Sequence, residues 1–93
     1  MKKPDKNTIV VTSSSIPASF PDEQGGSYPP PNDLNYDGLY EDVDGNVWFG
    51  FQDITVFFTN LQWSEENQPV LAFDFDKSGF IGFKDVVTLF GMI

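Results

Sequence analysis

Residues 74–85 read D-F-D-K-S-G-F-I-G-F-K-D, which is the spacing of a calcium-binding EF-hand loop. Calcium takes six to eight oxygen ligands at roughly 2.3–2.6 Å, and alternate residues of a tightly turning loop can direct such oxygens inward. Gly79 at place six permits the sharp bend, because glycine reaches positive φ without a Cβ clash. The candidate ligands at places one, three, five, seven and twelve are Asp74, Asp76, Ser78, the backbone carbonyl of Phe80, and Asp85.

A second copy of this pattern lies 32 residues upstream, where residues 42–53 read D-V-D-G-N-V-W-F-G-F-Q-D. Repetition at a fixed spacing indicates a duplicated structural unit. Two acidic turns on a solvated surface are the alternative, but they would not explain the glycine and phenylalanine that recur at the same places. The corresponding candidate ligands are Asp42, Asp44, Asn46, the backbone carbonyl of Trp48, and Asp53.

The first loop departs from the pattern at place six, where Val47 replaces glycine. A β-branched residue at positive φ is strained, so we expect this loop either to be distorted and weak or to turn differently. Both loops end in aspartate, whereas sensor EF-hands end in the longer glutamate, which binds calcium through both oxygens. No helical pattern precedes Asp42, so the first unit is predicted to have an exiting helix but no entering helix.

Acidic residues continue upstream of the first loop, in an overlapping register that starts at Asp33. This register has glycine at place six, but no helical pattern follows its last residue, Asp44. We therefore assign the EF-hand to the register that starts at Asp42 and treat the upstream register as an appended site. A solvated acidic turn is the alternative, although carboxylates without nearby cations repel one another. The sequence thus predicts two calcium ions, or three if the appended site binds one through Asp33, Asn35, Asp37, the carbonyl of Leu39, and Glu41.

The composition excludes several classes of function. The 93 residues carry 14 acidic and five basic side chains, and a net charge of −9 argues against binding to nucleic acid or anionic membranes. The chain has no cysteine for a disulfide and no histidine for the usual zinc, copper or iron sites. No apolar run approaches the roughly 20 residues that span a membrane. We expect no enzyme, since histidine, cysteine and arginine are missing and so small a chain leaves no room for a pocket of roughly 300–1,000 Å³.

The domain organisation follows from the distribution of proline, serine and glycine. These residues dominate residues 1–31, which we predict to be an extended linker or tether, although Phe20 and Tyr28 could pin it to the domain. The one apolar cluster there, residues 8–12, could form a short strand. Residues 32–93 are predicted to be the calcium-binding domain.

Helical spacing of apolar residues predicts a mainly α domain of about three short helices with paired calcium loops. One helix follows each loop, the first ending near Asn60 and the second near Gly91, and Pro69 predicts a short helix over residues 70–73. Ser64 indicates a further helix start. We expect the residues at place eight, Phe49 and Ile81, to face each other in an antiparallel bridge. Three more aromatic residues are predicted to complete the core: Trp63, Phe51 and Phe83.

The duplicated loops, the aspartate at place twelve, the exiting helices and the connecting helix resemble the dockerin family over residues 32–93. The resemblance implies a non-catalytic module that folds on calcium and binds a cohesin domain, in two orientations related by a half-turn. Phe51-Gln52 and Phe83-Lys84 stand where familiar bacterial dockerins carry a small polar pair. The resemblance places the partner-binding residues at the end of each loop and on the exiting helix: Phe51, Gln52, Thr55 and Val56, and Phe83, Lys84, Val87 and Thr88.

The leading hypothesis is therefore a calcium-folded interaction module that docks onto a cohesin-like partner and anchors or assembles a secreted or surface protein. It predicts an exposed apolar patch on a helix face. The alternative is a calcium-stabilised structural cap or spacer, which predicts that all aromatics are buried and that residues 9–11 pack on the domain.

A calcium sensor is less favoured, because sensors open methionine-rich grooves and this chain has two methionines. Weak sites fill at extracellular calcium, on the order of 10⁻⁴–10⁻³ M, so we expect a monomeric module of a larger secreted or cell-surface chain.

Overall fold

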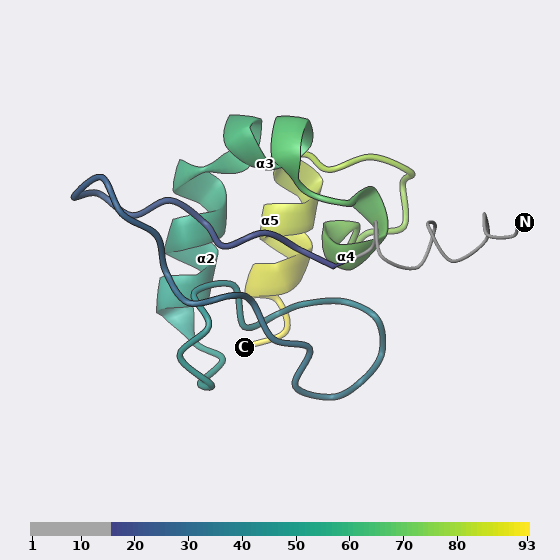
Figure 1. Cartoon of the computed structure of the whole chain (residues 1–93). Helices are drawn as coiled ribbons and strands as arrows, with labels where there is room; N and C mark the ends of the chain where they lie inside the picture. Colours follow the sequence, from purple (N-terminus) through teal and green to yellow (C-terminus); the bar gives the residue numbers. More distant parts are fainter. Residues whose placement is uncertain (1–15) are drawn as a thin grey trace, which may run out of the picture.

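Four helices make up the regular structure of residues 16–93, the part of the chain that the computed structural model describes (Figure 1). They are α2 (Phe51–Thr59), α3 (Leu61–Asn67), α4 (Val70–Phe73) and α5 (Phe83–Phe90). This part of the chain contains no strand, and its only β pairings are isolated bridges from Pro21 to Ser27 and from Asn32 to Asp42. The expectation of a small, mainly helical domain is confirmed, while the strand predicted over residues 8–12 lies outside the described residues.

Helices α2 and α5 each begin directly after a calcium-type loop, and the last loop residue caps the helix. The backbone N–H of Gly50 donates to the carboxylate of Asp53 at 2.8 Å, and Gly82 donates to Asp85 at the same distance. A carboxylate in the first turn also lies at the positive end of the helix dipole. The helices end where the sequence predicts, since α2 is followed by Asn60 and α5 by Gly91.

Two of the connecting elements differ from the prediction. Helix α3 starts at Leu61, and Ser64 lies inside it rather than at its start, because both the N–H and the hydroxyl of Ser64 donate to the carbonyl of Asn60. Helix α4 spans the predicted residues, with Pro69 just before its first residue. In the described residues 16–50 no helix precedes the first loop, as expected.

The core is built where α2 packs against α5 and the preceding segments close over them (Figure 1). Phe51 and Phe83, which we expected in the core, are 66% and 57% exposed, because Ile54 and Val86 occupy the inward faces of their helices instead. Trp63 is partly buried against the core, as expected. The buried apolar residues are Phe20, Leu39, Val43, Ile54, Val56, Phe57, Ala72, Phe73, Phe75, Ile81, Val86 and Leu89.

The two loops do not pair in the predicted way. Phe49 and Ile81 both contribute to the core, but no backbone bridge joins them. The first loop makes its antiparallel bridge with the preceding segment instead, where Asn32 and Asp42 exchange two backbone hydrogen bonds of 3.1 and 3.2 Å.

Residues 16–31, which we call the arm, cross the helices and place Phe20 in the centre of the core (Figure 1). The ring of Phe20 lies 5.3 Å from that of Trp63 and 5.4 Å from that of Phe73. Gln68 fixes the start of the arm through two hydrogen bonds to the backbone of Ala18, at 2.8 and 2.7 Å. The packed unit therefore includes part of the segment that the composition assigns to the linker. None of the helices in residues 16–93 is long and apolar enough to cross a membrane.

Candidate metal centres

The second loop gathers its three acids into one group. Carboxylate oxygens of Asp74, Asp76 and Asp85 all lie within 4.8 Å of one another. Two ligands of one calcium ion are separated by at most about 5 Å, twice the metal–oxygen distance, so one ion can contact all three. The backbone holds Asp74 in place, since the N–H groups of Ser78 and Gly79 donate to its two oxygens at 3.0 and 2.9 Å.

The first loop repeats this arrangement with deeper burial. Oxygens of Asp42, Asp44 and Asp53 lie within the same 4.8 Å, and the three residues are 0%, 2% and 1% exposed. In both loops the backbone N–H at place six donates to the carboxylate at place one. Val47 donates to Asp42 at 2.8 Å, and Gly79 donates to Asp74. The backbone N–H at place three likewise donates to the carboxylate at place twelve, at 3.2 Å in the first loop and 3.0 Å in the second. The two loops are therefore the same structure, as the repeat predicts.

The backbone turns at the same two places in each loop. At place six Val47 has φ +74° and Gly79 has φ +97°, and at place four Gly45 has φ +71° and Lys77 has φ +61°. The valine therefore accepts the strained conformation rather than opening the turn in a different way. Place four was not singled out from the sequence, because lysine and glycine there share no side-chain chemistry.

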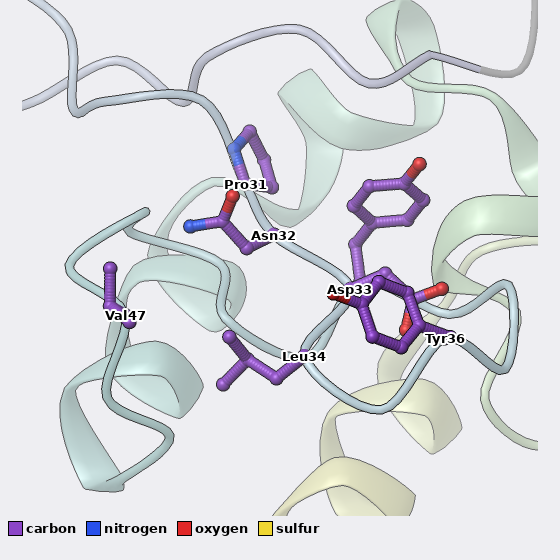
Figure 2. Close-up of a pocket in the computed structure, with 7 residues that line it drawn as sticks. Pro31, Asn32, Asp33, Leu34, Tyr36 and Val47 are labelled. Carbon is purple, nitrogen blue, oxygen red and sulfur yellow. The ribbon is translucent and has the colours of Figure 1, made fainter.

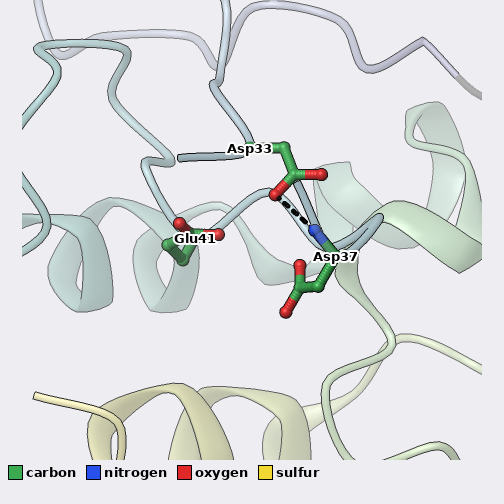
Figure 3. A group of neighbouring side chains, drawn as sticks. All are labelled: Asp33, Asp37 and Glu41. Carbon is green, nitrogen blue, oxygen red and sulfur yellow. Dashed lines mark hydrogen bonds between the residues drawn. The ribbon is translucent and has the colours of Figure 1, made fainter. Parts of the chain in front are cut away.

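A third acidic group lies upstream, formed by Asp33, Asp37 and Glu41 (Figure 3). Glu41, the residue at place nine of the upstream register, joins this group, whereas Asp44, its expected place twelve, belongs to the first loop. The loop turns at Tyr36 and Gly38, with φ of +60° and +91°, which are again places four and six. The upstream segment is thus a third loop of the same type that closes earlier.

The remaining candidate ligands are neutral oxygens on these loops. The hydroxyl oxygen of Ser78 lies 3.4 Å from Asp74 and 3.2 Å from the carbonyl oxygen of Phe80 and can donate to either, so three predicted calcium ligands of the second loop lie together. The side-chain oxygen of Asn46 accepts from the N–H of Trp48 at 2.9 Å. Asn35 is exposed, and Leu39 is buried with its N–H donating to Asp37 at 2.9 Å.

Burial raises the pKa of the carboxyl groups that close the loops. The pKa of Asp53 rises to about 7 and that of Asp85 to about 6, because burial removes solvent from the charged form. Burial also raises the pKa of Glu41. The pKa of Asp76 is lowered instead, chiefly by the neighbouring Ser78 side chain. Without a cation the two place-twelve carboxyls therefore hold protons easily, and a bound cation would favour their charged forms.

One oxygen of the first loop has no hydrogen-bond partner although it is buried. Asp42 is fully buried, and its Oδ2 accepts from Asn32 and Val47, both at 2.8 Å. Its Oδ1 has no partner. An unpaired buried carboxylate oxygen is costly, and a cation among the three acids would supply the missing interaction.

Six of the eight predicted partner-binding residues are exposed, three on α2 and three on α5. Phe51, Gln52 and Thr55 are exposed on α2, while Val56 is 4% exposed and packs in the core, so it is unable to contact a partner. On α5, Phe83, Lys84 and Val87 are exposed and Thr88 is half-buried.

Two exposed aromatic pairs join α2 and α5. Phe51 and Phe90 lie 6.2 Å apart, and Phe58 and Phe83 lie 5.8 Å apart, both edge to face. The offset of 32 residues exchanges one pair for the other, so the face has an approximate half-turn symmetry. We call these four residues the aromatic face. Phe58 and Phe90 are 55% and 54% exposed.

An open hollow of about 470 Å³ lies beside the third acidic group (Figure 2). Its volume falls in the range that we expected so small a chain to lack. Asp33 is the only acidic residue in its wall, and the others include Leu34, Tyr36 and Val47. The hollow therefore lacks a pair of carboxyl groups for acid–base chemistry.

No family model matches the chain, and no curated protein or solved structure is significantly similar to it.

Proposed function

We propose that the chain is a calcium-folded protein-interaction module that docks onto a cohesin-like partner domain and thereby anchors or assembles a secreted or cell-surface protein. The observation that carries the proposal is the duplicated loop with three converging carboxylates, followed each time by a helix whose exposed side bears matching aromatic residues.

Calcium is supported by the chemistry of the donors. Aspartate, serine, asparagine and backbone carbonyl oxygens are hard ligands that suit calcium or magnesium rather than softer metals. The first-loop acids are nearly fully buried, and a net charge of −9 opposes compaction unless cations offset it. Asp42, Asp44 and Asp53 would hold one ion, and Asp74, Asp76 and Asp85 the other.

Docking is supported by the aromatic face. Between α2 and α5 lies a shallow hollow of about 330 Å³ whose wall includes Phe51, Phe58 and Phe83. Exposed contiguous apolar surface of this kind marks interaction sites. The structural cap, the alternative, predicts that the aromatics are buried, and the exposure of these residues favours docking over it. The half-turn symmetry would allow a partner to bind in either of two orientations.

The calcium part is tested by calorimetric titration of metal-free protein, with circular dichroism recorded in parallel. We expect heat release with at least two ions per chain and a gain of helix signal, since metal binding and folding are coupled in such domains. An absence of heat together with a helix signal independent of calcium would overturn the proposal.

The docking part is tested with an immobilised cohesin-like domain in saturating calcium. Because either orientation uses one end of the symmetric face, Phe51→Ala or Phe83→Ala alone should weaken binding modestly, and the double variant should weaken it by more than about 2 kcal/mol. Leu71→Ala, which removes a 76% exposed leucine from α4, is the matched control and should bind normally. Unchanged binding by the folded double variant would contradict docking through this face.

A further inference from the structure

We propose that Asp33, Asp37 and Glu41 hold a third calcium ion, which fastens the arm to the first loop in place of an entering helix. This inference rests on the calcium-binding part of the proposed function and is independent of the partner. The three carboxylates have oxygens within 4.8 Å of one another and surround a common space (Figure 3). That separation again suits ligands of a single ion.

The independent observation is an oxygen of Glu41 that is buried and unpaired. Glu41 is 4% exposed. Its Oε2 accepts from the N–H of Leu34 at 3.0 Å, but its Oε1 has no partner. A buried carboxylate in this condition is strongly unfavourable unless a cation or a donor reaches it. No lysine or arginine occurs between residues 7 and 76, so the chain near the site supplies no cation.

Comparison of the two repeats shows that a buried glutamate is unexpected at position 41. The 32-residue offset places Glu41 at the position of Phe73, which immediately precedes the second loop and is fully buried in the core. One repeat therefore buries a phenyl ring where the other buries a carboxylate. A site for a cation accounts for a charged group at this position, which packing alone does not.

The position of the group explains what the ion does. Glu41 is followed by Asp42, whose own unpaired oxygen belongs to the first loop, so consecutive residues serve two neighbouring sites. Asp33 follows Asn32, which bridges to Asp42 at the end of the arm. The N–H of Tyr40 donates to the carbonyl of Ala72 at 2.9 Å, which ties the same loop to α4. An ion between Asp33 and Glu41 therefore fixes the arm against both the first loop and the core.

The experiment is calcium stoichiometry by calorimetry on the whole chain and on three variants. Wild type should bind three ions, and Glu41→Gln and Asp37→Asn should each bind two. Glutamine keeps an oxygen for the Leu34 N–H, and asparagine keeps one for the Leu39 N–H, so both variants preserve the local hydrogen bonds. Glu66→Gln, an exposed acid on α3 outside the three groups, is the control and should bind three.

The structural role has its own measurement, the exchange rate of the Asn32 amide hydrogen, which donates to Asp42 across the bridge. Asp37→Asn should speed this exchange while leaving the amides of α5 unchanged. Two ions in wild type and also in both variants, or three in Asp37→Asn, would overturn the third site while leaving the two-loop function intact. No binding by any protein would overturn both. If Glu41→Gln does not fold, the exposed Asp37 still decides the question.

Discussion

The two repeated acidic loops carry the same acids and matching hydrogen bonds but are supported in different ways. Helix α4 leads directly into Asp74 and places Phe73 in the core, whereas no helix precedes Asp42 in residues 16–50. The arm supports the first loop instead. It lies so close that a Cβ on Gly45 would be 2.5 Å from the carbonyl oxygens of Pro29 and Pro30. At the corresponding place the second loop has the exposed Lys77, with no arm beside it.

In this chain each repeated acidic loop is backed by a fully buried phenylalanine, whether or not a helix leads into it. The arm delivers Phe20 to the core, where its ring meets that of Phe73 edge to face at 5.4 Å. The two supports therefore converge on one contact, although one is helical and the other is extended. The first loop also buries its acids more deeply, so we expect its calcium-free form to be the less stable of the two.

The largest expected effect on stability comes from truncating Phe20 or Phe73, the two buried rings behind the loops. Phe20→Ala and Phe73→Ala should each lower the free energy of unfolding by about 3–5 kcal/mol, since both rings are fully buried. The measurement is urea unfolding in saturating calcium. Ile16→Ala, which truncates a 69% exposed residue of the same arm, should change little. A Phe20→Ala loss as small as that of the control would mean that the arm does not serve as an anchor.

The next effect is a dependence on pH that separates the two loops. The pKa values of about 7 for Asp53 and about 6 for Asp85 lie above the ordinary 3.8, so the folded calcium-free form binds protons that the unfolded chain does not. Its stability should therefore increase as the pH falls through about 7 and towards about 4. Calcium competes with those protons, so the calcium-bound form should lose stability over the same range.

Thermal unfolding of metal-free protein across this pH range checks the prediction. Asp53→Asn should remove the change in stability near pH 7, and Asp85→Asn should remove the change near pH 6, because asparagine stays neutral at every pH. A metal-free wild type whose melting temperature rises with pH would contradict the assignment.

A smaller effect is expected from exchanging the residues at place six. Val47 has φ +74° and is 66% exposed, so Val47→Gly relieves backbone strain and loses little packing. We expect a gain of about 1 kcal/mol in the free energy of unfolding, since glycine's added flexibility offsets part of the relief. Gly79→Val should cost a similar amount in the second loop, where φ is +97°. Chemical unfolding measures both, and a destabilised Val47→Gly would show that the valine side chain packs against a neighbour.

The sequence predicts the loops and helix ends well because local rules determine them. Acid spacing groups the three sets of carboxylates, and Asn60 and Gly91 directly follow the last residues of α2 and α5, although neither adopts the left-handed conformation of the usual helix cap. The sequence names Phe20 as a residue that could pin the arm to the domain, but it does not predict that the ring is fully buried, since one aromatic residue in a segment rich in proline and serine gives no periodic signal and its contacts are distant in the chain.

The exposure of Phe58 escapes prediction for another reason. Helix α2 has apolar residues on both sides, so helical spacing alone does not say whether Phe57 or Phe58 faces inward. Only the packing of α2 against α5 decides it, and that packing turns Ile54 and Phe57 inward. The register starting at Asp33 already names Glu41 as a candidate ligand, but its burial escapes prediction, because a glutamate beside other acids is usually solvated.

The smallest expected effect tests whether the symmetry of the loops extends to the aromatic face. Edge-to-face pairs contribute about 0.5–1.5 kcal/mol beyond their buried area, and the two pairs here have similar separations and similar exposure. Double-mutant cycles to leucine for Phe51 with Phe90, and for Phe58 with Phe83, should therefore give equal coupling energies. The cycle for Phe51 with Phe58, two turns apart on α2, is the control and should give none. Coupling in one pair alone would show that the repeats share their calcium loops but not their outer face, and a partner would then have one preferred orientation.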